Sequence, residues 1–178
     1  MRANLVAHHL NVLQTVGIIH RSRSEADKRR SYVRLVKGAL EGLTPCVFLA
    51  ARRVVFASTG ASARAPLAVA LWSKVSSIPA TSGGTMPAEA VSVGALAAAR
   101  RHSVHLLEQT PRALEEVLTD GDIVITVCDR AKEQIAPIGD LHWSISDPGR
   151  VGTDASFDAA FDEIHRRVAE LAPRVVTS

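Results

Sequence analysis

Residues 54–66 read Val54-Val55-Phe56-Ala57-Ser58-Thr59-Gly60-Ala61-Ser62-Ala63-Arg64-Ala65-Pro66. The apolar run at the start of this stretch predicts a short buried strand, and Pro66 is typical of the first turn of a helix. Between strand and helix lies a loop of small residues that ends in Arg64. Such a loop lets backbone N–H groups point inward, and the N-terminus of the following helix adds partial positive charge. The pattern predicts an oxyanion cradle. The alternative is an ordinary strand–helix loop with a surface arginine.

The predicted cradle would hold phosphate, arsenate or sulfate. The residues expected to line it are Ser58, Thr59, Gly60, Ala61, Ser62, Ala63 and Arg64. A guanidinium suits this task because its planar N–H groups bind two oxygens of one tetrahedral anion at once. The two cysteines, Cys46 and Cys128, show no spacing typical of a metal site, so we expect neither a metal nor a cofactor.

After the loop, strand-like and helix-like segments alternate along the chain. We predict strands at 54–56, 123–128 and 141–143, a short strand followed by a turn within 79–87, and helices at 88–101, 111–118 and 154–171. The segment 123–128 is almost wholly apolar and β-branched, which suits a parallel strand buried on both faces. The last helix carries large apolar residues at steps of three and four. This order predicts an α/β fold, a doubly wound parallel sheet of about four strands with helices on both faces.

The loop resembles the phosphate loop of the low-molecular-weight tyrosine phosphatase and arsenate reductase family, which reads cysteine, five residues, arginine and then usually serine. Two later segments resemble the same family in the same order. Residues 125–129 match its central strand, and residues 143–148 match the segment whose Asp-Pro supplies the general acid. The resemblance covers residues 53–178. It places Ser58 at the nucleophile position, Arg64 at the anion ligand and Asp147 at the acid.

Three departures from that family pattern bear on catalysis. Ser58 stands in place of the nucleophilic cysteine, Ala61 in place of an asparagine that braces the loop, and Ala65 in place of a serine that hydrogen-bonds the thiolate. A free thiol has a pKa of about 8.5, which a helix N-terminus and an arginine can lower, whereas a serine hydroxyl needs a neighbouring base. Only His142 and His105 are candidates to approach Ser58 in space.

We therefore expect an oxyanion-binding domain with impaired catalysis. The alternatives are an active arsenate reductase or tyrosine phosphatase, and an interaction scaffold that binds no anion. Cys128 lies near the first of the two extra cysteines of thioredoxin-linked arsenate reductases, but Ile135 stands about where the second falls. We interpret Cys128 as a buried thiol at a strand end.

The first 37 residues have a different character. They predict a helix over 4–16 ended by Gly17, then a hairpin with strands at 18–21 and 31–35. Residues 1–52 hold nine basic and three acidic side chains, while the whole chain carries a net charge of +3. The order of helix, glycine and basic hairpin resembles the end of an ArsR-type winged helix, in which the helix enters the DNA major groove and the hairpin contacts the backbone.

This second resemblance implies a DNA partner and a regulatory role in an arsenic or phosphate response. The expected DNA-binding residues are Asn4, His8, Asn11, Gln14, Arg21, Arg23, Lys28, Arg29 and Arg30. ArsR-type domains have two or three further helices before this point, so we expect residues 1–37 to be a partial winged helix that binds DNA weakly. Residues 38–52 are expected to be a linker to the domain at 53–178.

The bulk composition limits where the protein works. The sequence has no run of eighteen apolar residues, so we expect no membrane partner. Its N-terminus has no apolar signal core, so we expect no secretion. Two distant cysteines favour a reducing compartment, and we expect a cytoplasmic protein. A homodimer is left open by the sequence.

Overall fold

The computed structural model describes residues 2–39, 48–107 and 110–177, and the side chains from residue 5 onward. The chain divides into two compact units, Met1–Val47 and Phe48–Ser178. Each unit is described by itself. Cys46 lies outside the described residues.

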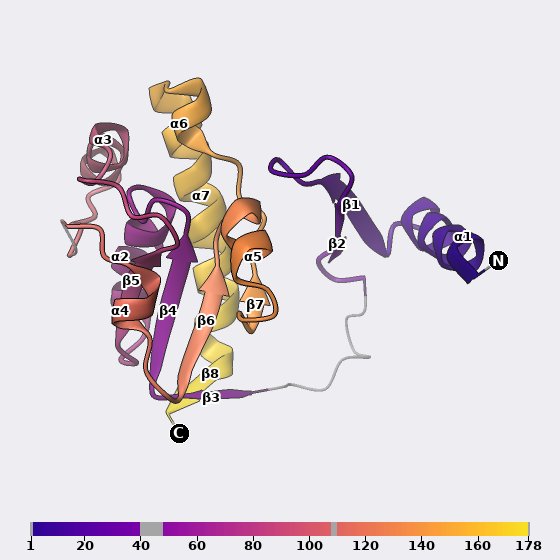
Figure 1. The fold of residues 1–178 in the computed structure, drawn as a ribbon, viewed down its shortest axis with the longest axis horizontal. Coiled ribbons are helices and arrows are strands. Elements are labelled where there is room, and N and C mark those ends of the chain that lie inside the picture. The colour runs from indigo at the N-terminus through magenta and orange to yellow at the C-terminus, as the bar shows by residue number, and fades with distance from the viewer. Residues whose placement is uncertain (1, 40–47, 108–109, 178) are drawn as a thin grey trace. The chain divides into compact units, whose positions relative to one another are not determined.

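The second unit is built on a four-stranded parallel sheet with the strand order β5-β4-β6-β7 (Figure 1). Its strands are β4 (Arg53–Ser58), β5 (Ala80–Gly84), β6 (Asp122–Thr126) and β7 (Leu141–His142). Every neighbouring pair is parallel. The predicted α/β fold is confirmed, and the predicted loop leaves the carboxyl end of β4, one of the two central strands. In open parallel sheets this end is where ligands bind.

Alternate residues of β4 face two apolar layers. Val54 and Phe56 pack in a large cluster with α2 (Arg64–Val75), α3 (Val93–Arg101) and α7 (Asp154–Leu171). On the opposite face, the second cluster holds Val55 and Ala57, together with both apolar residues of α4 (Leu114–Val117). All four strand residues have no exposed surface. Burial on both faces explains why this strand is continuously apolar in sequence.

The two ends of this unit meet in a separate two-stranded sheet. Strand β3 (Leu49–Ala51) pairs in parallel with β8 (Val175–Thr177). A short 3-10 helix, η1 (Ala172–Arg174), leads into β8. Residues 49–51, which the sequence analysis counted with the linker, therefore form a strand of the second unit.

Helix boundaries follow the sequence where local signals are strong. Helix α7 occupies the predicted residues, and Thr153 caps it with a reciprocal capping box to Ser156. Helix α2 begins two residues before the predicted Pro66, which still falls in the first turn, where backbone N–H groups have no intrahelical partner. Two further short helices are α5 (Asp129–Ile135) and α6 (Pro148–Val151).

The first unit contains helix α1 (Arg2–Thr15) and an antiparallel hairpin of β1 (Ile19–Arg23) and β2 (Ser31–Leu35). Gly17, at φ +76°, ends the helix in the left-handed conformation that glycine adopts without strain. The predicted order of helix and hairpin is thus present, and its assignment to a winged helix stays a prediction. No helix in the part of the chain that the structure describes has the length and apolar character to cross a membrane.

Candidate functional site

The loop between β4 and α2 is held by hydrogen bonds to its carbonyl groups. Five of its carbonyl oxygens accept a backbone hydrogen bond of 2.8–3.1 Å, those of Ser58, Thr59, Gly60, Ser62 and Ala63. Four of the donors lie in the segment 85–92 and the fifth lies in α2. In a trans peptide, the carbonyl group and the next N–H point in opposite directions. Four of these carbonyls point toward the segment 85–92, so the N–H groups that follow them point away from it, to the side called the inner side of the loop.

Ser58 is the last residue of β4, and its hydroxyl lies on that inner side. Its Oγ accepts a hydrogen bond from the N–H of Ala61 at 3.1 Å, and the residue is only 3% exposed. The hydroxyl proton can still be donated to an anion oxygen. Among the side chains that the structure describes, no basic group is hydrogen-bonded to this hydroxyl. The described contacts of this hydroxyl therefore include none that would promote its ionisation.

Arg64 supplies positive charge at the start of α2 and is 9% exposed. Its Nη1 donates to the carbonyl oxygen of Ile145 at 2.8 Å, and its Nη2 lies 3.3 Å from Oδ2 of Asp147. Asp147 also accepts from the N–H of Gly149 at 3.0 Å and so caps α6. The structure thus brings together Arg64 and Asp147, which lie 83 positions apart in the sequence. A guanidinium has five N–H donors, more than these two contacts use.

The two alanines that depart from the family pattern are both buried. Ala61 is 1% exposed and has φ +48°, the left-handed region. This conformation costs an ordinary L-residue roughly 1–2 kcal/mol, whereas asparagine adopts it more readily. Ala65, with no exposed surface, lies in the first turn of α2. The fold therefore keeps the loop conformation with an alanine at a position that favours asparagine or glycine.

Cys128 links the loop to α5. Its Sγ lies 3.4 Å from Oγ1 of Thr59 and accepts from the N–H of Ala131 at 3.4 Å. The residue is 2% exposed and caps α5, which agrees with its interpretation as a buried thiol at a strand end. It therefore braces one side of the loop.

His142 was a candidate to approach Ser58, but its ring nitrogens contact Thr126 and Asp129 instead. Its Nδ1 lies 2.8 Å from Oγ1 of Thr126, and its Nε2 lies 3.2 Å from Oδ1 of Asp129. Because a carboxylate only accepts, Nε2 donates to Asp129. Burial lowers the pKa of His142, while Asp129 partly opposes that shift. The other candidate, His105, is exposed.

Sequence reasoning missed the segment 85–92 as the support of the loop. Its backbone donors are Thr85, Met86, Ala88 and Ser92. One signal was present in the glycines before it. A Cβ added at Gly84 would lie 3.0 Å from the carbonyl oxygen of Thr59, so a side chain there would crowd the loop and glycine permits the close approach of the two segments.

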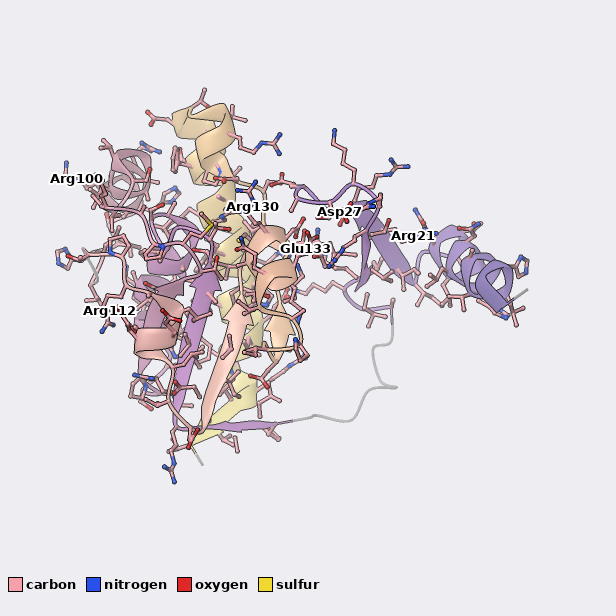
Figure 2. All side chains as sticks on the ribbon, in the orientation of Figure 1. Arg21, Asp27, Arg100, Arg112, Arg130 and Glu133 are labelled. Carbon is pink, nitrogen blue, oxygen red and sulfur yellow. The ribbon has the colours of Figure 1, made fainter. Side chains whose placement is uncertain are left out.

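The predicted DNA-binding residues lie in the first unit, apart from the loop in sequence. His8, Asn11, Gln14, Arg23, Lys28, Arg29 and Arg30 are exposed, Arg21 is half-buried, and the side chain of Asn4 lies outside the described residues. Arg21 extends from β1 to donate to Asn11 at 2.8 Å, and Asp27 lies in the turn of the hairpin (Figure 2). Asp27 pairs with Arg29 at 3.0 Å and approaches Arg30 at 3.6 Å. These contacts partly neutralise the positive charge of the hairpin turn.

A metal site finds no support in the described part of the chain. No group of three or more histidine, cysteine, aspartate or glutamate side chains there is placed to hold an ion. The candidate site therefore consists of backbone N–H groups, one hydroxyl, one guanidinium and one carboxylate.

Comparison with known proteins finds relatives for the second unit. Residues 53–178, more than two thirds of the chain, match the family model described as low molecular weight phosphotyrosine protein phosphatase. Among curated proteins no match was found.

Among solved structures, an arsenate reductase from Archaeoglobus fulgidus is 26% identical, with a TM-score of 0.60 over 67% of this chain and 98% of that one. The tyrosine phosphatase Wzb from Escherichia coli, solved in complex with sulphate, is 16% identical, with a TM-score of 0.61 over 68% and 96%. A cysteine-to-serine mutant of the arginine phosphatase YwlE, with a phosphorylated active-site serine, is 19% identical, with a TM-score of 0.56 over 68% and 93%.

Proposed function

The chain belongs to the low molecular weight phosphotyrosine protein phosphatase family over residues 53–178, and from this membership we propose that its loop binds phosphate or arsenate without efficient turnover. The observation that carries the proposal is the set of outward-pointing loop carbonyls, which turns backbone N–H groups inward beside Arg64. Charge-assisted hydrogen bonds of this kind each contribute roughly 1.5–3 kcal/mol. The sulphate-bound Wzb structure supports an anion as the ligand of the shared fold.

Impaired turnover follows from the chemistry of Ser58. The hydroxyl has no basic hydrogen-bond partner among the described residues, and a serine needs such a base to attack phosphorus at a useful rate. Removing the thiolate of the family also removes a fixed negative charge from the cradle. An entering dianion therefore meets less repulsion here than it would above a thiolate.

The test is calorimetric titration of the full chain with phosphate, arsenate and sulfate. We expect binding that Arg64→Ala weakens roughly 10- to 100-fold, since the variant loses one or two charge-assisted hydrogen bonds. Arg100→Ala is the matched control, because it removes one exposed positive charge at the far end of α3. Equal loss in both variants, or no heat with the parent chain, would refute anion binding at the loop and favour a scaffold.

A second assay separates binding from catalysis. Hydrolysis of an aryl phosphate that disappears in Ser58→Ala would show an active phosphatase. Reduction of arsenate to arsenite by the full chain would show an arsenate reductase. Binding without either activity supports the impaired domain.

For the first unit, we propose weak binding to duplex DNA and thereby a regulatory role in an arsenic or phosphate response. The supporting observation is the basic hairpin, on which Arg23 and Lys28 are exposed. Each neutralised DNA phosphate lowers the logarithm of the affinity by about 0.9 for each tenfold rise in salt.

Fluorescence anisotropy with a duplex at several salt concentrations tests this second proposal. Lys28→Ala and Arg23→Ala should each reduce the salt slope by about one, while Arg100→Ala should leave it unchanged. A slope near zero for the parent chain would exclude the DNA role.

A further inference from the structure

We propose that Ser58 is a covalent phosphoryl acceptor, which takes the group from an acyl phosphate and keeps it as phosphoserine. This inference rests on the proposed anion site, because the donor must first be seated in the loop. It differs from that site in its product, a stable covalent bond on this chain.

The position of the hydroxyl carries the first step of the argument. Ser58 Oγ lies on the inner side of the loop, where it accepts the N–H of Ala61 at 3.1 Å. A phosphoryl group seated on the remaining inward N–H groups would therefore place its phosphorus next to this oxygen. The same N–H groups and Arg64 would then bind the three oxygens of the product, since phosphoserine carries three strong acceptors.

The lack of a base selects the class of donor. His142 is occupied with Thr126 and Asp129 and is 13% exposed. Without a base the serine is a weak nucleophile, so the donor must carry a good leaving group. An acyl phosphate meets this need because its leaving group is a carboxylate, which departs without being protonated.

The step balances with no further reactant. The Oγ–P bond forms, and the bond from phosphorus to the acyl oxygen breaks with its electron pair leaving on the carboxylate. The serine proton passes to a phosphoryl oxygen and then to water. The phosphoserine is then not hydrolysed, because water would have to expel an alkoxide, a far poorer leaving group than the thiolate of the family. The group therefore stays on Ser58.

The experiment is incubation of the full chain with acetyl phosphate, followed by intact mass spectrometry and peptide mapping. We expect one phosphoryl group per chain on the parent protein and on Ser77→Ala, a matched loss of an exposed serine outside the loop. Ser58→Ala should gain none, and a urea unfolding transition like that of the parent chain shows that this variant is folded.

The other outcomes distinguish failure of the acceptor from failure of the anion site. Phosphate binding by the parent chain without any transfer overturns the acceptor and leaves the anion site in place. If the parent chain shows no phosphate binding and no transfer, the acceptor and the anion site are both overturned. A phosphoryl group that persists in Ser58→Ala assigns the modification to another residue and overturns the acceptor as well.

Discussion

Replacing Asp147 by asparagine should tighten phosphate binding. The carboxylate lies 3.3 Å from Nη2 of Arg64 and is 42% exposed, while the arginine side chain is 10% exposed. An anion bound to the same guanidinium must share it with this negative charge. Asparagine keeps one oxygen that accepts from Gly149, so the substitution preserves the cap of α6 while it removes the charge and the contact with Arg64.

The size of the effect follows from Coulomb repulsion. A phosphate on Arg64 would lie on the order of 5 Å from the carboxylate, and each pair of like unit charges then costs about 0.8 kcal/mol in water. For a phosphate that is mostly dianionic, this repulsion weakens the binding free energy by about 1–2 kcal/mol. Because Asp147 is exposed, this solvent-screened value applies rather than that of a buried pair. Asp147→Asn should therefore lower the Kd for phosphate roughly 5- to 30-fold.

Calorimetric titration of phosphate measures this change at low and high salt. Asp154→Asn is the matched control, since it removes a carboxylate that pairs with Arg101 at 2.9 Å on the surface. Its Kd should stay within about twofold of the parent value, and raising the salt should shrink the gap between the variants. An unchanged or weaker affinity in Asp147→Asn would mean that the carboxylate does not compete for Arg64, and the argument would fail.

Three further outcomes concern stability in urea. The free energy of unfolding of Ala61→Gly should be about 1–2 kcal/mol higher than that of Ala57→Gly. Both alanines are buried, but only Ala61 has a positive φ, +48°. Equal values for the two variants would contradict strain at Ala61. Gly94→Ala should destabilise by roughly 1–3 kcal/mol despite its helical position, since the added Cβ would meet the ring of Phe157; a gain in stability would contradict that contact. His142 has a pKa lowered from 6.5 by burial, against the opposing effect of its carboxylate partner, so the unfolded chain takes up the proton first and stability falls as the pH drops below about 6.5. His142→Gln should show a smaller loss of stability between about pH 7.5 and about pH 5.5, and an equal loss would place the titration elsewhere.

Local signals explain which elements the sequence predicted well. Helix α7 has both a periodic apolar face and a capping box, and its boundaries match the prediction. Strand β4 was predicted as 54–56 and extends over Arg53–Ser58, since its alternating faces are both buried. In these elements local preference and tertiary packing agree.

The missed elements depend on contacts between distant residues. Helix α3 was expected to start at residue 88 but begins at Val93, because the N–H groups of Ala88 and Ser92 bond the loop carbonyls instead. Strands β3 and β8 have three residues each, and α6 has four. Such short elements show no periodicity, so nothing local distinguishes them from turns.

In the candidate site too, some features were visible as local sequence signals and others depend on contacts between distant residues. The loop 58–64 was visible in sequence as adjacent small residues before an arginine, whereas the carbonyl bonds that turn its N–H groups inward come from a segment more than twenty positions away. That support is independent of the residue at position 58, so a serine can replace the thiol without loss of the backbone cradle. Under the proposed function, binding depends on the backbone and Arg64, while turnover depends on a side chain and its base. Substitutions at Ser58 and at Arg64 should for this reason separate phosphoryl transfer from anion affinity.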